Sequence, residues 1–168
     1  MHVAAGIPAV AVVVAAGLAS RPASPPPPIV GCDEIIGRAI SGTADGYRLV
    51  LGVVSAAPAR LTHAVPIESR PWTYWRKAGL VVRAGRAAVT VSVPDDWRKR
   101  LGITWGNRSG VVDSLRIAGC PSPPHVWNAY AGGFYMRARS ACVPLTFRVG
   151  RRSATVRFGI GRSCGTSS

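Results

Sequence analysis

Four cysteines that follow an apolar N-terminal segment most constrain the fold of this 168-residue chain. The apolar segment covers residues 3–19, and a proline-rich stretch over 22–28 comes next. This order is typical of an exported protein, whose cysteines meet an oxidising compartment and form disulfides. The residues concerned are Cys32, Cys120, Cys142 and Cys164. We therefore expect an extracytoplasmic domain, secreted or tethered, whose fold is cross-linked.

Residues 1–19 are interpreted as a signal peptide or an N-terminal anchor. Small residues over 17–19 predict cleavage after Ala19. An uncleaved anchor stays open, because the apolar segment is close to the lower limit of about 17–25 residues for a membrane-spanning helix. An acylated Cys32 is a weaker alternative, because Arg21 and several prolines separate it from the apolar core.

We predict that residues 20–30 form a proline-rich linker and that residues 31–168 form one domain. Proline-rich chain with few bulky side chains is extended and semi-rigid. The remaining length suits a single hydrophobic core. We expect a disulfide-stapled domain that the linker holds away from a surface.

Alternating apolar and polar residues predict β-strands throughout this domain. The alternation is clearest over 145–149 and 154–158, with a turn at 150–152, which predicts a hairpin with Val149 opposite Ser153. A similar pair is expected at 78–83 and 87–93, joined by a turn at Ala84 and Gly85. Further strands are expected at 34–40, 47–55, 101–105, 111–118 and 133–137, and a helical turn at 94–100. The predicted fold is all-β: a single antiparallel β-sandwich, immunoglobulin-like or a small barrel.

The hairpin favours one of the three possible disulfide pairings. Cys142 and Cys164 lie just beyond its two outer ends, and a bulge at Gly159 and Gly161 can absorb their offset. We therefore predict the bridges Cys142–Cys164 and Cys32–Cys120. The cysteines are too widely spaced to bind a metal, so we expect neither a metal nor another cofactor.

Positive charge is concentrated in the second half of the chain. Residues 1–69 have no net charge, and residues 70–168 supply the whole net charge of +14. The candidate anion-binding residues are Arg137, Arg139, Arg148, Arg151, Arg152, Arg157 and Arg162. Outside a cell the abundant polyanions are wall phosphate polymers and lipid head groups, and the arginine fork binds phosphate well. The alternative is a solvated strand face with no ligand.

Trp72, Tyr74 and Trp75 form an aromatic patch flanked by basic residues. Such rings can stack on sugars or bases. Trp72 and Tyr74 share one face of an extended segment and Trp75 takes the other, so core packing of at least one tryptophan is the favoured interpretation over ligand stacking.

No catalytic residues are assigned. The Gly-x-Ser-x-Gly match at 161–165 lacks a following helix, and Asp95 and Asp96 fit a turn or a helix cap. His63 or His125 can join a serine and a carboxylate in a triad, for which the acids in question are Asp33, Asp45 and Asp113. Any chain of this length offers such sets, so we expect no catalysis.

The stretch from Trp97 onward has a recognisable pattern. It comprises Trp97, 105–106, 115–120, Trp127, 132–134, 142–145 and 156–164. In these residues the chain resembles small exported actinobacterial proteins of unknown function. The resemblance covers less than half of the chain and implies a shared fold and shared bridges, but no activity.

These observations predict a non-catalytic, monomeric protein that binds an anionic cell-wall polymer or membrane surface through its arginine-rich half. No specific nucleic acid is expected as a partner. Two alternatives stay open: a secreted hydrolase or its inhibitor-like accessory domain, and a structural module that binds another protein.

Overall fold

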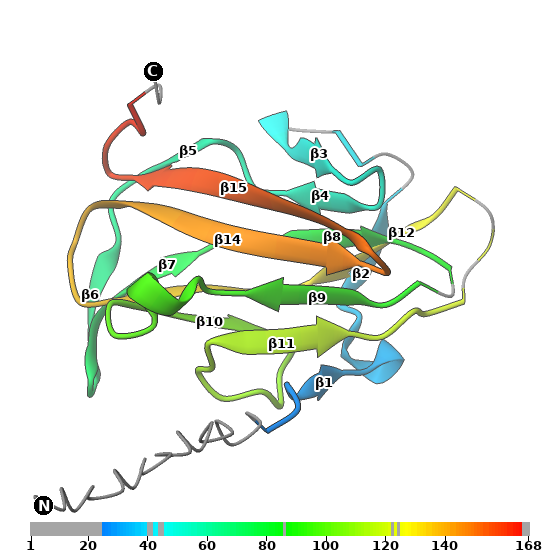
Figure 1. Ribbon diagram of the computed structural model, residues 1–168, viewed down its shortest axis with the longest axis horizontal. Coiled ribbons are helices and arrows are strands. Elements are labelled where there is room, and N and C mark those ends of the chain that lie inside the picture. Colours follow the sequence, from blue (N-terminus) through cyan, green and yellow to red (C-terminus); the bar gives the residue numbers. More distant parts are fainter. Residues whose placement is uncertain are drawn as a thin grey trace, which may run out of the picture.

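The computed structural model describes residues 25–39, 42–43, 46–85, 87–121, 123 and 125–165. These residues form an all-β protein with three sheets and no α-helix (Figure 1). The predicted segment 1–19 and the linker up to residue 24 lie outside the described residues. Within the described ranges, no helix is long and apolar enough to span a membrane.

The six-stranded sheet contains the predicted hairpin, formed by β14 (Ala141–Val149) and β15 (Arg152–Ile160), toward one of its edges. Its strand order is β1 (Ile29–Val30), β11 (Ser114–Ile117), β9 (Val89–Ser92), β14, β15 and β5 (Arg60–Leu61). Both edge strands pair in parallel, β1 with β11 and β5 with β15, and the inner pairings are antiparallel. The sheet is therefore mixed.

The other two sheets lie together behind the six-stranded sheet (Figure 1). The five-stranded sheet has the order β2 (Gly37–Ala39), β12 (Trp127–Tyr130), β8 (Leu80–Arg83), β4 (Val54–Ala56) and β3 (Arg48–Val50). The four-stranded sheet has the order β10 (Leu101–Trp105), β13 (Gly132–Met136), β7 (Trp72–Lys77) and β6 (Val65–Ser69). They adjoin where β7 leads into β8, and the N–H of Ala78 donates to the carbonyl of Gly132 at 2.9 Å. The described residues also include two short 3-10 helices, η1 (Cys32–Glu34) and η3 (Asp95–Trp97).

The prediction of a single antiparallel sandwich is wrong in its finer detail, because the chain forms three sheets and one of them is mixed. One reason lies at Gly132 and Gly133. A Cβ atom at either residue would collide with a neighbouring backbone carbonyl, that of Thr104 or of Arg76. Such close approach lets the chain pass from one sheet to the next without an intervening loop. The parallel edge strands are two residues long, too short to give an alternating pattern.

Aromatic rings join the two layers through the core. The Trp105 and Phe134 rings meet edge to face with centroids 5.9 Å apart, and Phe134 lies 5.3 Å from Phe158 in the opposite layer. The indole N–H of Trp105 donates to the carbonyl of Ala78 at 2.9 Å, which satisfies the only polar atom of this buried side chain. The core therefore crosses all three sheets.

The C-terminal hairpin is confirmed, with a register shifted by one residue. Arg148, not Val149, lies opposite Ser153. Leu145, Phe147 and Phe158 are buried as expected. Because the pairing is shifted, the ladder runs without a bulge to Ala141 opposite Ile160.

The second expected hairpin is wrong. Residues 80–83 form β8 of the five-stranded sheet, whereas 89–92 form β9 of the six-stranded sheet, so the two strands do not pair. The expected strand at 34–40 starts only at Gly37, because Glu34 belongs to η1. The expected strand at 47–55 is a hairpin of β3 and β4, with positive φ angles at Leu51 and Gly52 in its turn.

Both predicted disulfides are present, Cys32–Cys120 and Cys142–Cys164. Cys142 lies opposite Gly159 inside the hairpin, and the chain then reverses at Gly161, whose φ is +64°. The carbonyl of Arg162 lies so close to Gly159 that no Cβ would fit there. This reversal brings Cys164 back to Cys142 and replaces the bulge that the sequence predicted.

The first bridge belongs to a group of contacts that we call the N-terminal clamp: Cys32–Cys120, Glu34 and the ion pair Asp33–Arg108. The Glu34 side chain is buried, and its carboxylate accepts hydrogen bonds from the backbone N–H groups of Gly31, Asn107 and Arg108 at 3.1, 2.7 and 3.0 Å. Asp33 pairs with Arg108 at 2.6 Å. The clamp fixes η1 to the loop between β10 and β11.

Candidate anion-binding site

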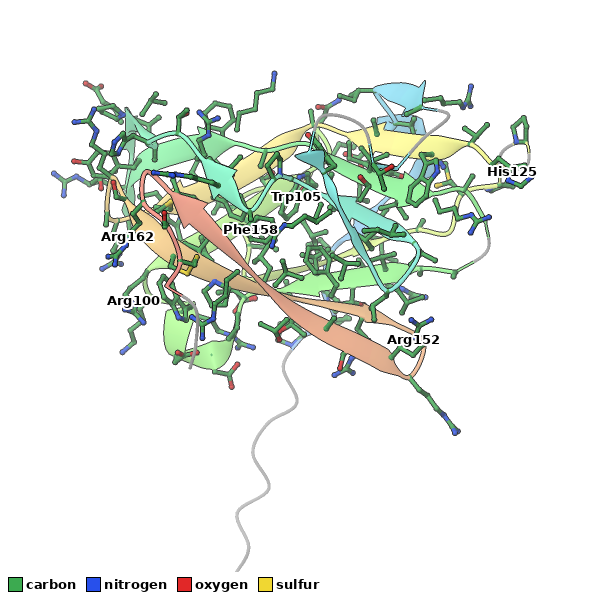
Figure 2. All side chains as sticks on the ribbon, turned by 90° about the horizontal axis from the view of Figure 1, so that it is seen from above. Arg100, Trp105, His125, Arg152, Phe158 and Arg162 are labelled. Carbon is green, nitrogen blue, oxygen red and sulfur yellow. A yellow bond between two sulfur atoms is a disulfide. The ribbon has the colours of Figure 1, made fainter. Side chains whose placement is uncertain are left out.

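The predicted arginines fall into two groups at opposite ends of the β14–β15 hairpin. Arg148, Arg151 and Arg152 lie at its turn, and Arg137, Arg139, Arg157 and Arg162 lie at or near its base. Figure 2 shows Arg162 and Arg152 at opposite ends of the β14–β15 hairpin. The structure therefore divides a set of residues that the sequence suggested as one face.

Four arginines line one hollow of about 470 Å³ at the base of the hairpin. We call it the arginine pocket, and its cations are Arg100, Arg137, Arg157 and Arg162. Arg139 is exposed on the adjoining loop and does not line the hollow. Arg100 is the member that sequence reasoning missed. Arg100 lines the pocket because β10 pairs with β13. This pairing places Leu101 opposite Met136 and Arg100 beside Arg137.

Local structure orients these side chains. Arg157 occupies an outward position of β15, opposite Pro144, and Arg162 lies in the reversal that the Cys142–Cys164 bridge closes. The Arg100 guanidinium lies 4.1 Å from the Trp97 ring centroid and donates to the Asp96 carbonyl at 3.2 Å. A guanidinium stacked in this way loses little further freedom when it binds an anion.

No carboxylate neutralises the arginine pocket. Among the described residues, ion pairs involve only Arg98, with Asp95 and Asp113, and Arg108, with Asp33. No acidic side chain lines the hollow. Four like charges in one concave surface raise the local positive potential and attract anions. The arrangement is suited to a phosphate or carboxylate group.

Arg48 supports the pocket from the far side of β15. Its guanidinium donates to the Arg157 carbonyl at 3.0 Å and to the Ala57 carbonyl at 3.4 Å, and it lies 4.7 Å from the Phe158 ring centroid. Burial lowers the pKa of Arg48. This arginine therefore holds the backbone of Arg157 in place.

One serine and one histidine stand at the rim of the pocket. Nδ1 of His63 lies 2.9 Å from Oγ of Ser140, which lines the hollow. The pair is exposed, and within the described ranges no carboxylate contacts His63. Of the expected triad acids, Asp33 and Asp113 pair with arginines instead, and Asp45 lies outside the described residues. His125 is exposed on a distant loop (Figure 2).

The outward face of the six-stranded sheet carries a second basic hollow. Arg148 lies beside Thr90 on β9, and Thr90 lies beside Arg116 on β11. These three residues line a hollow of about 540 Å³, which we call the outer hollow. Arg116 was missed by sequence reasoning, since only the pairing of β9 with both β11 and β14 brings it close to Arg148.

The aromatic patch lies on β7 of the four-stranded sheet. Tyr74 packs against the core, whereas Trp72 covers Gly102, where a Cβ atom would stand 2.9 Å from its ring. Trp75 lies opposite Tyr135, and its buried indole N–H has no hydrogen-bond partner. Core packing is thus observed for the tyrosine. None of these three rings lines the arginine pocket.

The described residues contain no cluster of three His, Cys, Asp or Glu side chains able to hold a metal ion. All four cysteines are in disulfides. The chain matches no protein-family profile and no curated protein. Its resemblance to exported actinobacterial proteins therefore stays a prediction, and function is argued from geometry.

Proposed function

We propose that this protein is an exported, non-catalytic, monomeric binding protein that attaches to a phosphate-bearing polymer or lipid surface of the cell envelope. The arginine pocket carries the proposal, because four guanidinium groups without acidic partners line one hollow. The two disulfides are consistent with an extracytoplasmic protein. In this proposal the protein is either secreted or tethered to the envelope by an uncleaved N-terminal segment.

Binding would depend on charge-assisted hydrogen bonds from the arginine forks. Each such bond contributes roughly 1.5–3 kcal/mol net. Arg157 and Arg162 come from the hairpin and the following reversal, and Arg100 comes from the segment just before β10. Donors that converge from several elements select a compact anionic group over scattered charge.

One observation favours a second candidate, hydrolysis of an ester adjacent to an anionic group. The Ser140 hydroxyl lies 2.9 Å from a His63 ring nitrogen, within reach for activation. This pair is exposed, and no carboxylate of the described residues contacts it, so binding is the better-supported function. His63→Ala separates the two, because it removes the base that hydrolysis needs, and His63 is not among the residues that line the arginine pocket.

The test is calorimetric titration of the purified chain with a polyol-phosphate polymer and with phosphatidylglycerol vesicles. The double variant Arg157→Gln/Arg162→Gln should weaken binding of one probe by at least about tenfold. Arg38→Gln/Arg83→Gln removes the same charge from exposed positions on the five-stranded sheet and serves as the matched control.

Rising salt should weaken the wild-type interaction steeply, since phosphate contacts are screened. Equal weakening in the control variant would mean that binding reports net charge and not the pocket. Unchanged affinity in the pocket variant would overturn the proposal.

A further inference from the structure

The outward face of the central strands of the six-stranded sheet has an unusual composition. Outward positions follow from the register of β11, β9, β14 and β15. Apart from Pro144, Cys142 and Gly159, every residue at these positions is an arginine, a serine or a threonine. No acidic, aliphatic or aromatic side chain stands among them.

The hydroxyl residues form a row across the sheet. Ser114 lies opposite Ser92, Ser92 opposite Thr146, and Thr146 opposite Thr155. The Thr146 and Thr155 hydroxyls are 2.9 Å apart. These short side chains make a low polar floor that can donate to and accept from sugar, polyol or phosphate oxygens.

Longer basic side chains flank this floor on both sides along β14. Toward the hairpin turn stand Arg148 and Arg116 of the outer hollow. Toward the hairpin base stands Arg157, which belongs to the arginine pocket. Arg148 and Pro144, the strand partner of Arg157, are four residues apart, or about 13 Å at roughly 3.3 Å per residue. A single head group cannot reach both.

We propose that the ligand is a linear polyol-phosphate or sugar-phosphate polymer that lies along β14 and β15, with one phosphate in the arginine pocket and another in the outer hollow. This inference rests on the proposed function and specifies its ligand as a chain with repeating anionic groups. The hydroxyl row contacts the uncharged part of the repeat between them.

Two other polyanions fit this face less well. Single-stranded nucleic acid binds by stacking its bases on aromatic rings, and these outward positions carry none. A bilayer is a broad surface that contacts projecting groups, whereas the cations here line two hollows beside a sheet face. The charge and the shape both favour a flexible polymer.

The test compares short and long ligands. Synthetic glycerol-phosphate oligomers of two and about twelve repeats are titrated into the full chain, because occupying two linked sites raises affinity far beyond that of either site. Wild type should bind the long oligomer at least about tenfold more tightly than the dimer. Phosphatidylglycerol vesicles and single-stranded DNA are titrated in parallel.

Three variants distinguish the outcomes. Arg116→Gln/Arg148→Gln should bring the long oligomer down to about the affinity that the arginine pocket alone has for the dimer. Thr146→Val/Thr155→Val keeps side-chain volume and should weaken the long oligomer severalfold. Arg38→Gln/Arg83→Gln is again the charge-matched control, and thermal unfolding checks that every variant is folded.

Each result bears on one of the two proposals. Full binding of the long oligomer by Arg116→Gln/Arg148→Gln, with loss in Arg157→Gln/Arg162→Gln, would overturn the two-site inference and leave the pocket as the binding site. Tighter binding of vesicles or DNA than of the long oligomer would also overturn it. If Arg157→Gln/Arg162→Gln bound both the dimer and the long oligomer as tightly as wild type, the proposed function itself would be overturned.

Discussion

The β1 end of the fold, which carries the N-terminal clamp, and the base of the β14–β15 hairpin, where the arginine pocket lies, are on opposite sides of the ribbon (Figure 1). Each of the two regions contains a disulfide. At the clamp, Glu34 is buried among three backbone donors and Asp33 is paired with Arg108. At the pocket, four arginines have no acidic partner. Charge therefore fixes backbone at one end and stays available to a ligand at the other.

The strongly basic composition alone does not show which arginines lie near an acidic residue. The chain has only seven acidic residues, and among the described residues four have carboxylates that make ion pairs or hydrogen bonds: Asp33, Glu34, Asp95 and Asp113. None of the four serves the arginine pocket. An excess of arginine throughout a sequence can reflect composition alone, whereas arginines that gather in acid-free hollows raise the local positive potential there.

The two disulfides should separate stability from binding. In the chain-entropy account, opening Cys32–Cys120, which spans 88 residues, costs about 4.5 kcal/mol, and opening Cys142–Cys164, which spans 22, costs about 3.5 kcal/mol. We expect Cys32→Ser/Cys120→Ser to lose more stability yet keep phosphate-polymer binding, and Cys142→Ser/Cys164→Ser to lose binding. Denaturant unfolding and titration measure both. Equal loss of binding in the two variants would break the comparison.

Glu34 should be the most sensitive single side chain of the clamp. Glu34→Ala leaves three backbone N–H groups without their acceptor, and we expect it to destabilise the protein by about 3 kcal/mol. Asp33→Asn removes an exposed ion pair and should cost at most about 1 kcal/mol. Urea unfolding gives both values. Similar losses of unfolding free energy in the two variants would show that the buried carboxylate of Glu34 contributes no more to stability than the exposed one of Asp33.

Arg100 should be sensitive to the shape of its cation as well as its charge. Arg100→Lys keeps the charge but loses the planar fork stacked on Trp97, so polymer binding should weaken by about 1 kcal/mol, or roughly fivefold. Arg83→Lys, on the five-stranded sheet, is the control. If both variants bind like wild type, the pocket acts only through net charge.

Alkaline pH should destabilise the folded protein through Tyr130. Burial, and then the charge of Glu34, raise the pKa of Tyr130 above its ordinary value of 10.0. A raised pKa in the folded state gives stability that is complete below the unfolded value and is lost as the pH rises through the folded one. Tyr130→Phe should therefore flatten the fall in melting temperature above about pH 10 relative to wild type. A melting temperature that falls equally steeply above about pH 10 in Tyr130→Phe and wild type would contradict this prediction.

Local sequence patterns predicted the hairpin and its bridge well. Alternation over 145–149 and 154–158 is a direct consequence of one buried face, and Cys142 and Cys164 are close in sequence to the ends of that hairpin. The one-residue error in register came from the turn. Gly150 has a φ of +57°, and Val149 pairs directly with Arg152 across it, which gives a shorter connection than the sequence suggested.

Long-range pairings were beyond the same patterns. β8 and β9 each show apolar faces, but nothing in them indicates that one joins the five-stranded sheet and the other the six-stranded sheet. The pocket depends on such a pairing, because β10 must meet β13 before Arg100 can stand beside Arg137. Sequence reasoning thus found three of the four pocket arginines and took the turn arginines for part of the same face.

The short length of β5 has a consequence for the behaviour of the protein in solution. β5 pairs only with Gly159 and Ile160, so along residues 152–156 no described strand covers the outer edge of β15. An uncovered edge is a template on which a second copy of the chain can add a strand. Arg152 and Arg157 stand on this strand, and their mutual repulsion between copies opposes edge-to-edge aggregation.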